Sequence, residues 1–429
     1  MTGTASLVNL AARRLGAGVI AASDEFFGEK ENLLRPGPPV IRPGTFGHKG
    51  QVVDGWETRR RRGPGEDYAI VRLGAAGVIS EVVVDTTHFT GNFPAECAVS
   101  ACGTDGYPGP DGLLGPGTEW AEIVPRSRLA GDAENRFAVS DGRRFTHVRL
   151  VIRPDGGVAR LRVNGEVIPD PRLLDGLSLD LVAAENGGTV TGASDRFYSP
   201  PENLIAPGLA AVMGDGWETR RRRGPGSDWV EFRLAAAGRI RQAVLDTSCF
   251  LGNAPAACTL LGRAAGEPGP ASARRAGGAA DQGHSGQAGG AGTHAGGEGW
   301  SELLPRTPLQ PDTRHRFRLP EAAAARRVTH VRLEIHPDGG LARLRLPGEL
   351  DPAGRAGLGL RWFDRLPAGH LVTVLAAECG VAAPLAEQLA GRRPCGTPDR
   401  LDSVLADGLP GLEAAAAARI RAVVLGRAR

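Results

Sequence analysis

The chain has 429 residues, of which 41% are apolar and 23% charged, and its formal net charge is only +3. These values are typical of a globular protein with two or three domains. They exclude a large basic field for nucleic acid or an anionic membrane surface. No run approaches the roughly 20 apolar residues of a membrane span. Lysine occurs only as Lys30 and Lys49, and all other members of the 51 Lys and Arg residues are arginine.

The N-terminal segment, residues 1–21, contains a short apolar run behind Arg13 and Arg14 but no convincing cleavage site. It is expected to be a poorly structured leader and not a signal peptide. The six cysteines form no CxxC pair and no metal-finger spacing: they are Cys97, Cys102, Cys249, Cys258, Cys379 and Cys395. Reduced thiols in a cytoplasmic protein are the simplest expectation.

From about residue 22 the chain is an internal duplication. DGWETRRRRGPGEDY at residues 54–68 returns as DGWETRRRRGPGSDW at 215–229, shifted by 161 (215 − 54). THVRLVIRPDGGVARLRVNGE at 146–166 returns as THVRLEIHPDGGLARLRLPGE at 329–349, shifted by 183 (329 − 146). Because this period is far too long for a solenoid, each copy is expected to be a whole domain. We place module 1 at residues 22–190 and module 2 at residues 191–352.

Both copies carry short strand-like runs. Residues 67–74, 81–89 and 146–152 are rich in β-branched residues, alternate in part, and are bounded by Gly, Pro and Asp turns. PDGG at 154–157 and 337–340 predicts turns between strands. Long helical periodicity is absent, so the sequence predicts a mostly β fold of two tandem jelly-roll-like β-sandwich modules.

Two segments depart from this pattern. The jump in shift locates an insertion at residues 271–299 of module 2, rich in Gly, Ala, Ser and His. Such a segment is expected to be a flexible surface loop, and a metal tract using His284 and His294 is the weaker interpretation. Residues 355–429 are rich in Leu and Ala with helical spacing, which predicts a small α-helical C-terminal segment.

The duplicated motifs resemble those of the allantoicase family. The resemblance rests on DGWETRRRR, DTxxFxGN and THVRLxIxPDGGxARLR, each present twice, and covers about residues 22–350. It implies galactose-binding-like jelly rolls that hydrolyse allantoate to ureidoglycolate and urea in purine (allantoin) degradation, and it implies a homo-oligomer. The tail is similar to the start of the ureidoimidazoline (OHCU) decarboxylases. AARIR at 417–421 puts Ala417 where that family has a histidine, so a truncated, catalytically inactive remnant is expected.

The arginine motif offers groups for this reaction, which needs a proton for the departing nitrogen and donors for a carboxylate. On a strand, alternation separates Glu57, Arg59 and Arg61 from Trp56, Thr58 and Arg60. Arginines would bind the carboxylate while Glu57 or Asp54 moves a proton. The alternative is a structural ion-pair network with Trp56 as a core anchor. The candidate substrate-binding residues here are Trp56, Arg59, Arg60, Arg61, Arg220 and Arg222. Acidic neighbours and the lack of an aromatic platform argue against phosphate or nucleic acid as the ligand.

DTTHFTGN at residues 85–92 is a second candidate cluster. Asp85 and His88 could form an oriented acid–base pair and Asn92 an amide donor to a ureido oxygen, although Gly-Asn is also turn chemistry. Module 2 has Cys249 at the position of His88. This difference favours one competent site, in module 1, but it leaves open two active modules or a site shared between them.

Other polar residues have structural interpretations. His147 and His330 are expected to be half-buried, the PDGG aspartates to be turn residues, and Cys97 to be a small buried hydrophobe. No set of residues has trusted metal-ligand spacing, so no tightly bound cofactor is expected. A divalent metal held by Glu57, Asp85 and His88 stays open.

Two rival functions remain on the sequence alone. A jelly roll can bind an anion or another ligand without chemistry, and a pseudoenzyme would neither bind nor turn over allantoate. Within the enzyme class, ammonia-releasing hydrolysis of allantoate usually uses paired metals, for which no ligand set is evident.

Overall fold

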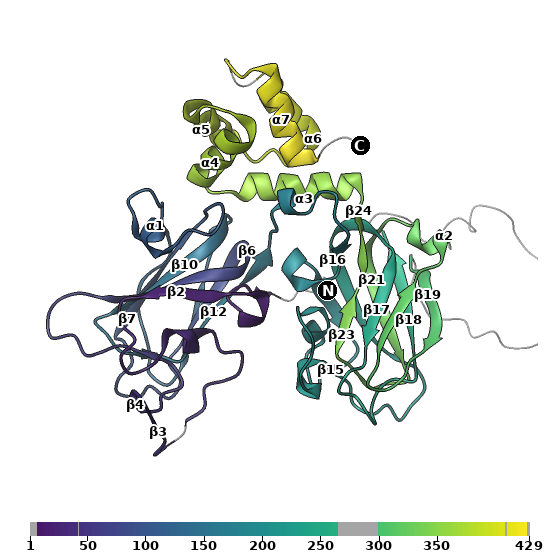
Figure 1. The fold of residues 1–429 in the computed structure, drawn as a ribbon, viewed down its shortest axis with the longest axis horizontal. Coiled ribbons are helices and arrows are strands. Elements are labelled where there is room, and N and C mark those ends of the chain that lie inside the picture. Colours follow the sequence, from purple (N-terminus) through teal and green to yellow (C-terminus); the bar gives the residue numbers. More distant parts are fainter. Residues whose placement is uncertain (1–6, 42, 265–298, 408–409, 427–429) are drawn as a thin grey trace, which may run out of the picture.

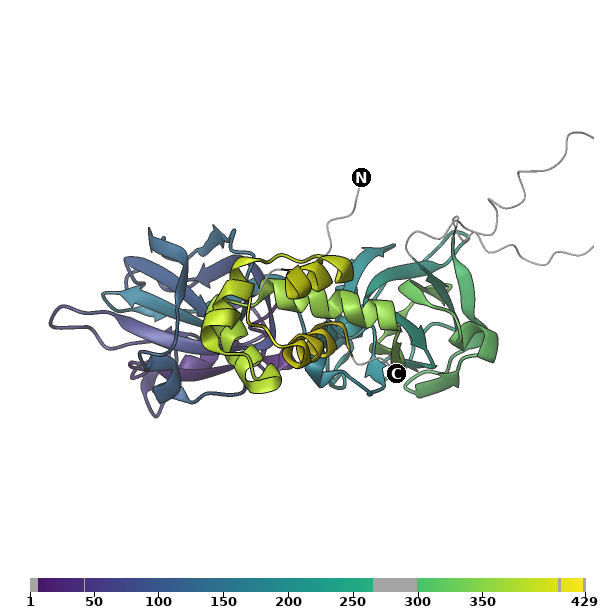
Figure 2. The same ribbon diagram turned by 90° about the horizontal axis from the view of Figure 1, so that it is seen from above.

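The computed structural model describes residues 7–41, 43–264, 299–407 and 410–426. Two β-sandwich modules lie next to each other, and a helical domain lies across one end of both (Figure 1). Seen from above, the helices cover the junction between the modules (Figure 2). The insertion predicted at residues 271–299, with His284 and His294, lies outside the described residues apart from Gly299.

Module 1 is organised around β6 (Asp67–Asp85), a strand of 19 residues. Its first part pairs mainly with β2 (Gly18–Ala22) and β10 (Arg144–Arg153), and its second part pairs with β9 (Glu134–Ala138) and β12 (Arg160–Val167). The strand therefore connects both layers of the sandwich. The other elements are β1 (Val8–Asn9), η1 (Arg13–Leu15), η2 (Lys30–Leu34), β3 (Phe46–Gly47), β4 (Gly50–Gln51), β5 (Trp56–Glu57), β7 (Glu96–Cys102), α1 (Pro110–Leu114), β8 (Ala121–Arg128), β11 (Gly157–Val158) and η3 (Pro171–Leu173).

The expectation of a poorly structured leader at residues 1–21 requires correction over its described part. β1 pairs with β12, and β2 pairs with β6. Leu10 and Ala11 are fully buried in the core of module 1. The short apolar run thus belongs to the sandwich, because burying it removes apolar surface from water.

Module 2 repeats this plan with one break. It begins before the expected residue 191, because β13 (Leu179–Asp180) pairs with β24 (Pro347–Leu350), so the expected boundary between residues 190 and 191 falls inside module 2. β16 (Asp228–Ile240) and β17 (Gln242–Asp246) together occupy the place of β6. β16 pairs with β21 (Val328–His336) and β24 (Pro347–Leu350). β17 pairs with β20 (Arg314–Arg318) and β23 (Arg343–Arg345). The remaining elements are β13 (Leu179–Asp180), η4 (Ala184–Asn186), β14 (Thr189–Ala193), η5 (Pro201–Ile205), η6 (Met213–Asp215), β15 (Trp217–Glu218), β18 (Ala257–Arg263), β19 (Ser301–Pro308), β20 (Arg314–Arg318), α2 (Glu321–Ala324), β21 (Val328–His336), β22 (Gly340–Leu341), β23 (Arg343–Arg345) and β24 (Pro347–Leu350).

Each module has its own apolar core, in which Trp56 and Trp217 are fully buried. Leu15 packs against both cores and so links the modules. Glycine is required where β11 and β22 pass the aromatic ring of the DTxxFxGN motif. A Cβ on Gly157 would lie 1.9 Å from the ring of Phe89, and one on Gly340 would lie 2.0 Å from the ring of Phe250. The predicted pair of tandem β-sandwich modules followed by helices is confirmed.

The tail forms a third core from five helices. They are α3 (Pro352–Arg365), α4 (Ala368–Cys379), α5 (Ala383–Gly391), α6 (Pro398–Asp407) and α7 (Ala414–Leu425). Arg361 on α3 donates to Glu166 of module 1 at 3.1 Å and to the carbonyl of Ala235 in module 2 at 3.3 Å. α3 therefore contacts both modules, as Figure 1 also shows. No helix within the described ranges is long and apolar enough to cross a membrane.

Candidate active site

Glu57 lies on β5, a two-residue strand that pairs with β11 and also bridges to Gly28. The neighbouring Trp56 and Thr58 are buried, and the Trp56 indole N–H donates to the carbonyl of Asp24 at 2.7 Å. Thr58 accepts a bond from the backbone N–H of Gly156 at 3.1 Å. These anchors fix the strand so that Glu57 lies on the opposite, half-buried side, as alternation predicts. Trp56 is thus a core anchor in this structure.

The Glu57 carboxylate accepts a hydrogen bond of 2.8 Å from the side-chain amide of Asn92. Burial raises the pKa of Glu57, and the Asn92 hydrogen bond opposes that rise only in part. A carboxyl group with a raised pKa keeps a proton closer to neutral pH than an ordinary glutamate does. The pair can therefore hold and deliver a proton, with Asn92 fixing the direction of the carboxyl group.

The arginines after Glu57 divide into two kinds. The backbone and side chain of Arg59 both donate to Asp24, at 2.9 and 2.8 Å. Arg61 donates to Asp67 at 2.8 Å, and its backbone N–H donates to Asp155 at 2.7 Å. Arg60 and Arg62 are exposed, and neither makes a hydrogen bond or ion pair with any residue in the described ranges. Of the four arginines in this run, these two have guanidiniums that are free to bind an anion, and Arg60 is the nearer to Glu57 in sequence.

The predicted grouping of Arg60 with the Trp56 side of the strand is wrong. β5 ends at Glu57, and both Arg59 and Arg60 are exposed. Alternation holds only while the backbone remains a paired strand, so it does not extend past Thr58.

Asp54 is committed to a structural network. It accepts bonds from Arg160 at 2.7 Å, from Arg35 at 2.8 Å and from the backbone N–H of Val40 at 2.9 Å. Burial by itself would raise the pKa of Asp54, but the hydrogen bonds from Arg160 and Val40 outweigh it and the pKa is lowered. A carboxylate held ionised in this way is a poor donor of protons.

Asp85 and His88 are not bonded to each other in the structure. The buried Asp85 carboxylate accepts from the backbone N–H of Thr87 at 2.8 Å. His88 is exposed, its backbone N–H donates to Asp132 at 2.8 Å, and its Nε2 lies 3.3 Å from the carbonyl oxygen of Pro39. The same left-handed backbone, with φ of 72°, occurs at His88 and at Cys249. The turn therefore keeps its shape whichever side chain it carries.

The histidine and the cysteine interpreted as structural are buried, and His147 is more deeply buried than the half-buried position expected of it. His147 is 1% exposed, and burial lowers its pKa to about 4, with Arg72 adding to the effect. Burial raises the pKa of the Cys97 thiol to about 12. The PDGG aspartate Asp155 is more than a turn residue, because it holds the backbone of Arg61. Across the part of the chain that the structure describes, no three His, Cys, Asp or Glu side chains are placed to hold a metal ion.

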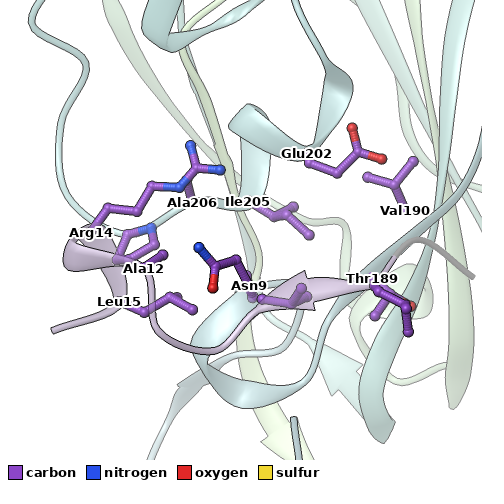
Figure 3. Close-up of a pocket in the computed structure, with 13 residues that line it drawn as sticks. Asn9, Ala12, Arg14, Leu15, Thr189, Val190, Glu202, Ile205 and Ala206 are labelled. Atoms are coloured by element: carbon purple, nitrogen blue, oxygen red, sulfur yellow. The ribbon is translucent and has the colours of Figure 1, made fainter. Parts of the chain in front are cut away.

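A pocket lies elsewhere, at the junction of the modules (Figure 3). It is lined by Asn9, Arg14 and Leu15 from the N-terminal segment and by module 2 residues that include Thr189 and Glu202. Arg14 donates to Asn203 at 2.9 Å beside it. None of its 13 lining residues is a predicted site residue.

Comparison with known proteins decides the family. The profile of the allantoicase repeat matches residues 8–168 and 179–351. A probable allantoicase of Nocardia farcinica is 54% identical over 349 residues, which cover 81% of this chain and 96% of that protein. The corresponding Streptomyces coelicolor protein is 49% identical, covering 82% of this chain and 88% of that protein. The chain belongs to the allantoicase family.

The solved structures agree with this assignment. The crystal structure of an allantoicase from Saccharomyces cerevisiae superimposes with a TM-score of 0.63 at 31% identity. The match covers 80% of this chain and 93% of that chain. The match to the allantoicase repeat ends at residue 351, just before α3 begins, so the matched region does not include the helical tail.

Module 2 keeps the same scaffold. Glu218 accepts from Asn253 at 2.8 Å, Arg220 donates to Asp195 at 3.0 Å, and Arg222 pairs with Asp228. The surroundings differ. The sulfur of Met213 lies 3.7 Å from the Asn253 amide nitrogen, Cys249 replaces His88, and Arg196 stands where module 1 has Glu25.

Several parts of the candidate site were missed from the sequence. Asp24 organises both Trp56 and Arg59, although it lies 35 residues before Arg59. The loop before Glu57 is also specific to module 1. The signal for it was present: ENLL and ENLI align with a shift of 171 (203 − 32), whereas DGWETRRRR aligns with a shift of 161. The change of ten residues marks a longer loop in module 1.

Proposed function

We propose that the allantoicase reaction of this chain, hydrolysis of allantoate to ureidoglycolate and urea, takes place in module 1, with Glu57 as the proton-transferring group. The observation that carries this proposal is the half-buried Glu57 carboxyl group, whose pKa is raised and whose orientation is fixed by Asn92. Glu218 in module 2 has the same amide partner, but it lacks the His88 and lysine surroundings of module 1.

The chemistry follows from these groups. Protonated Glu57 gives its proton to the ureido nitrogen as the bond from that nitrogen to the central carbon breaks, so that urea leaves neutral. A water oxygen forms the new bond to the central carbon, and its lost proton returns to the Glu57 carboxylate. Arg60 binds the substrate carboxylate, and His88, exposed on the same turn-bearing segment as Asn92, is available to a ureido oxygen.

Three further proposals concern the location of the protein, its oligomeric state and the origin of its tail. We propose a cytoplasmic location, supported by six free cysteines, five of them buried. We propose a homo-oligomer, supported by the sheet edges of a duplicated sandwich. We also propose that the tail descends from an OHCU decarboxylase-like domain, supported only by its sequence resemblance and the alanine at position 417.

The test is urea released from allantoate by the purified protein, measured with and without urease beside Glu57→Gln. Urease-dependent ammonia from the wild type that is lost in Glu57→Gln supports the proposal. Ammonia released without urease would indicate attack at a ureido carbonyl. No turnover, with allantoate still raising the melting temperature, would indicate a binding protein.

A further inference from the structure

Both lysines of the chain meet at one place in module 1. The Lys30 ammonium lies 3.0 Å from Oε1 of Glu25. The Lys49 ammonium donates to the backbone carbonyl of Glu25 at 2.7 Å and lies 3.7 Å from Oε1 of Glu29. Since every other basic residue is arginine, the composition of the chain does not explain why lysine persists here.

Module 2 has no counterpart of this network. By alignment of ENLL with ENLI, Glu25, Glu29 and Lys30 correspond to Arg196, Pro200 and Pro201. Lys49 belongs to a loop that module 2 lacks. Module 1 has 19 residues between Leu34 and Asp54 (35–53), whereas module 2 has nine between Ile205 and Asp215 (206–214).

The longer loop runs from residue 36 to residue 52, and the structure describes its residues 36–41 and 43–52. These described parts are attached to both segments that hold Glu57. At one end the Pro39 carbonyl oxygen lies 3.3 Å from His88, on the turn that leads to Asn92. At the other end Lys49 holds the carbonyl of Glu25. The segment after Glu25 pairs with Glu57, because the N–H groups of Phe27 and Gly28 both donate to the Glu57 carbonyl, at 3.2 and 3.1 Å.

Apolar burial does not hold this loop in place. Ile41 and Phe46 are 61% and 73% exposed, so the loop depends on its polar anchors. The side chain of Lys49 is 26% exposed, and its ammonium group is compact and has three donors. It can therefore serve a backbone carbonyl and a carboxylate from one point, whereas the planar fork of arginine is suited to a bidentate partner.

We propose that loop 36–52 is the wall of the module 1 site that contacts substrate, and that Lys49 is the positioning residue that fixes this wall against the Glu25 segment. The inference rests on the proposed function of module 1. It assigns the specificity of that module to a structure absent from module 2, since both modules have the carboxylate–amide pair.

The test compares Lys49→Met with Arg196→Met, which removes the cation from the matching segment of module 2. A loosened wall weakens contacts that substrate makes equally before and during reaction, so KM should rise about tenfold while kcat stays within about twofold. Arg196→Met should leave both constants unchanged. Unchanged KM in Lys49→Met, or an equal rise in Arg196→Met, would overturn the inference.

Proteolysis provides a readout that does not depend on turnover. In Glu57→Gln, allantoate should slow chymotrypsin cleavage after Phe46, and adding Lys49→Met should weaken that protection. Absence of protection would overturn the inference even if the wild type releases urea. Failure of the wild type to release urea would instead count against the proposed function.

Discussion

Glu57 in module 1 and Glu218 in module 2 each accept a 2.8 Å hydrogen bond from an asparagine. The anchors beneath them are also shared: buried Trp56 and Trp217 donate to the carbonyls of Asp24 and Asp195. The residues around the carboxylate–amide pair differ between the modules. Module 1 has His88, two lysines and a long loop, and module 2 has Cys249, Met213 and a short loop. The duplication has kept the scaffold of the site and changed the groups that would meet a substrate.

The largest effect should come from the two glutamates. Glu57→Gln removes the transferable proton and should lower kcat by at least about a hundredfold. Glu218→Gln should leave kcat within about twofold. Because the pKa of Glu57 is raised by burial, its ionised form costs stability above the unfolded pKa, and the melting temperature of Glu57→Gln should not fall at neutral pH. Similar losses of kcat in the two variants would show that the modules contribute equally.

The second-largest difference between the modules should come from their exposed arginines, Arg60 and Arg221. Arg60→Met removes the proposed carboxylate ligand and should raise KM by about tenfold or more. Arg221→Met removes the matching residue of module 2 and should change KM by less than twofold. A normal KM in Arg60→Met would contradict the role of Arg60 as carboxylate ligand. So would a larger rise in KM in Arg59→Met, which loses the ion pair to Asp24, if that variant shows no loss of stability.

Asn92 should control the pH dependence. Its hydrogen bond lowers the pKa of Glu57 against the effect of burial, so Asn92→Ala should raise that pKa further. Activity that needs protonated Glu57 is present below this pKa and is lost as pH rises through it. The alkaline limb of kcat/KM should therefore move to higher pH in Asn92→Ala and stay in place in Asn253→Ala. A shift to lower pH would contradict the assignment of Glu57.

Replacing His88 with the cysteine of module 2 should have a smaller effect on kcat/KM. His88→Cys gives module 1 the residue of module 2 without changing the turn, since both positions have the same backbone conformation. Since the His88 imidazole is bonded to no carboxylate among the described residues and lies near the Pro39 carbonyl instead, we expect a fall in kcat/KM of about tenfold or less. A loss as large as that of Glu57→Gln would identify His88 as the proton donor.

The smallest catalytic effect is expected at the tail. Arg361→Met removes the bonds from α3 to Glu166 and to the Ala235 carbonyl. It should lower the free energy of unfolding by about 1 kcal/mol and leave KM unchanged. Thermal unfolding and steady-state kinetics of the same preparation check both statements, and a large loss of activity without loss of stability would place the tail in the active site.

Whether a feature could be predicted from the sequence depends on how far apart along the chain its residues lie. The duplication, the buried Trp56 and the turn glycines follow from motifs within one segment. The long-range polar contacts do not. Asp24 and Arg59 lie 35 residues apart, as do Glu57 and Asn92, and each pair meets only in the folded chain. The predicted Asp85–His88 pair is absent for a local reason: Asp85 binds the N–H of Thr87 and closes the turn. Alternation misplaced Arg60 because β5 is only two residues long.

The measurement that most directly tests the central claim is urea release by a chain whose module 2 site has been removed. Glu218→Gln, Asn253→Ala and Arg221→Met would be combined in one protein and compared with the wild type in a urease-coupled assay. If module 1 carries the reaction, kcat and KM should both stay within about twofold of wild type. A fall in kcat/KM of more than tenfold, in a protein with unchanged thermal unfolding, would contradict the account.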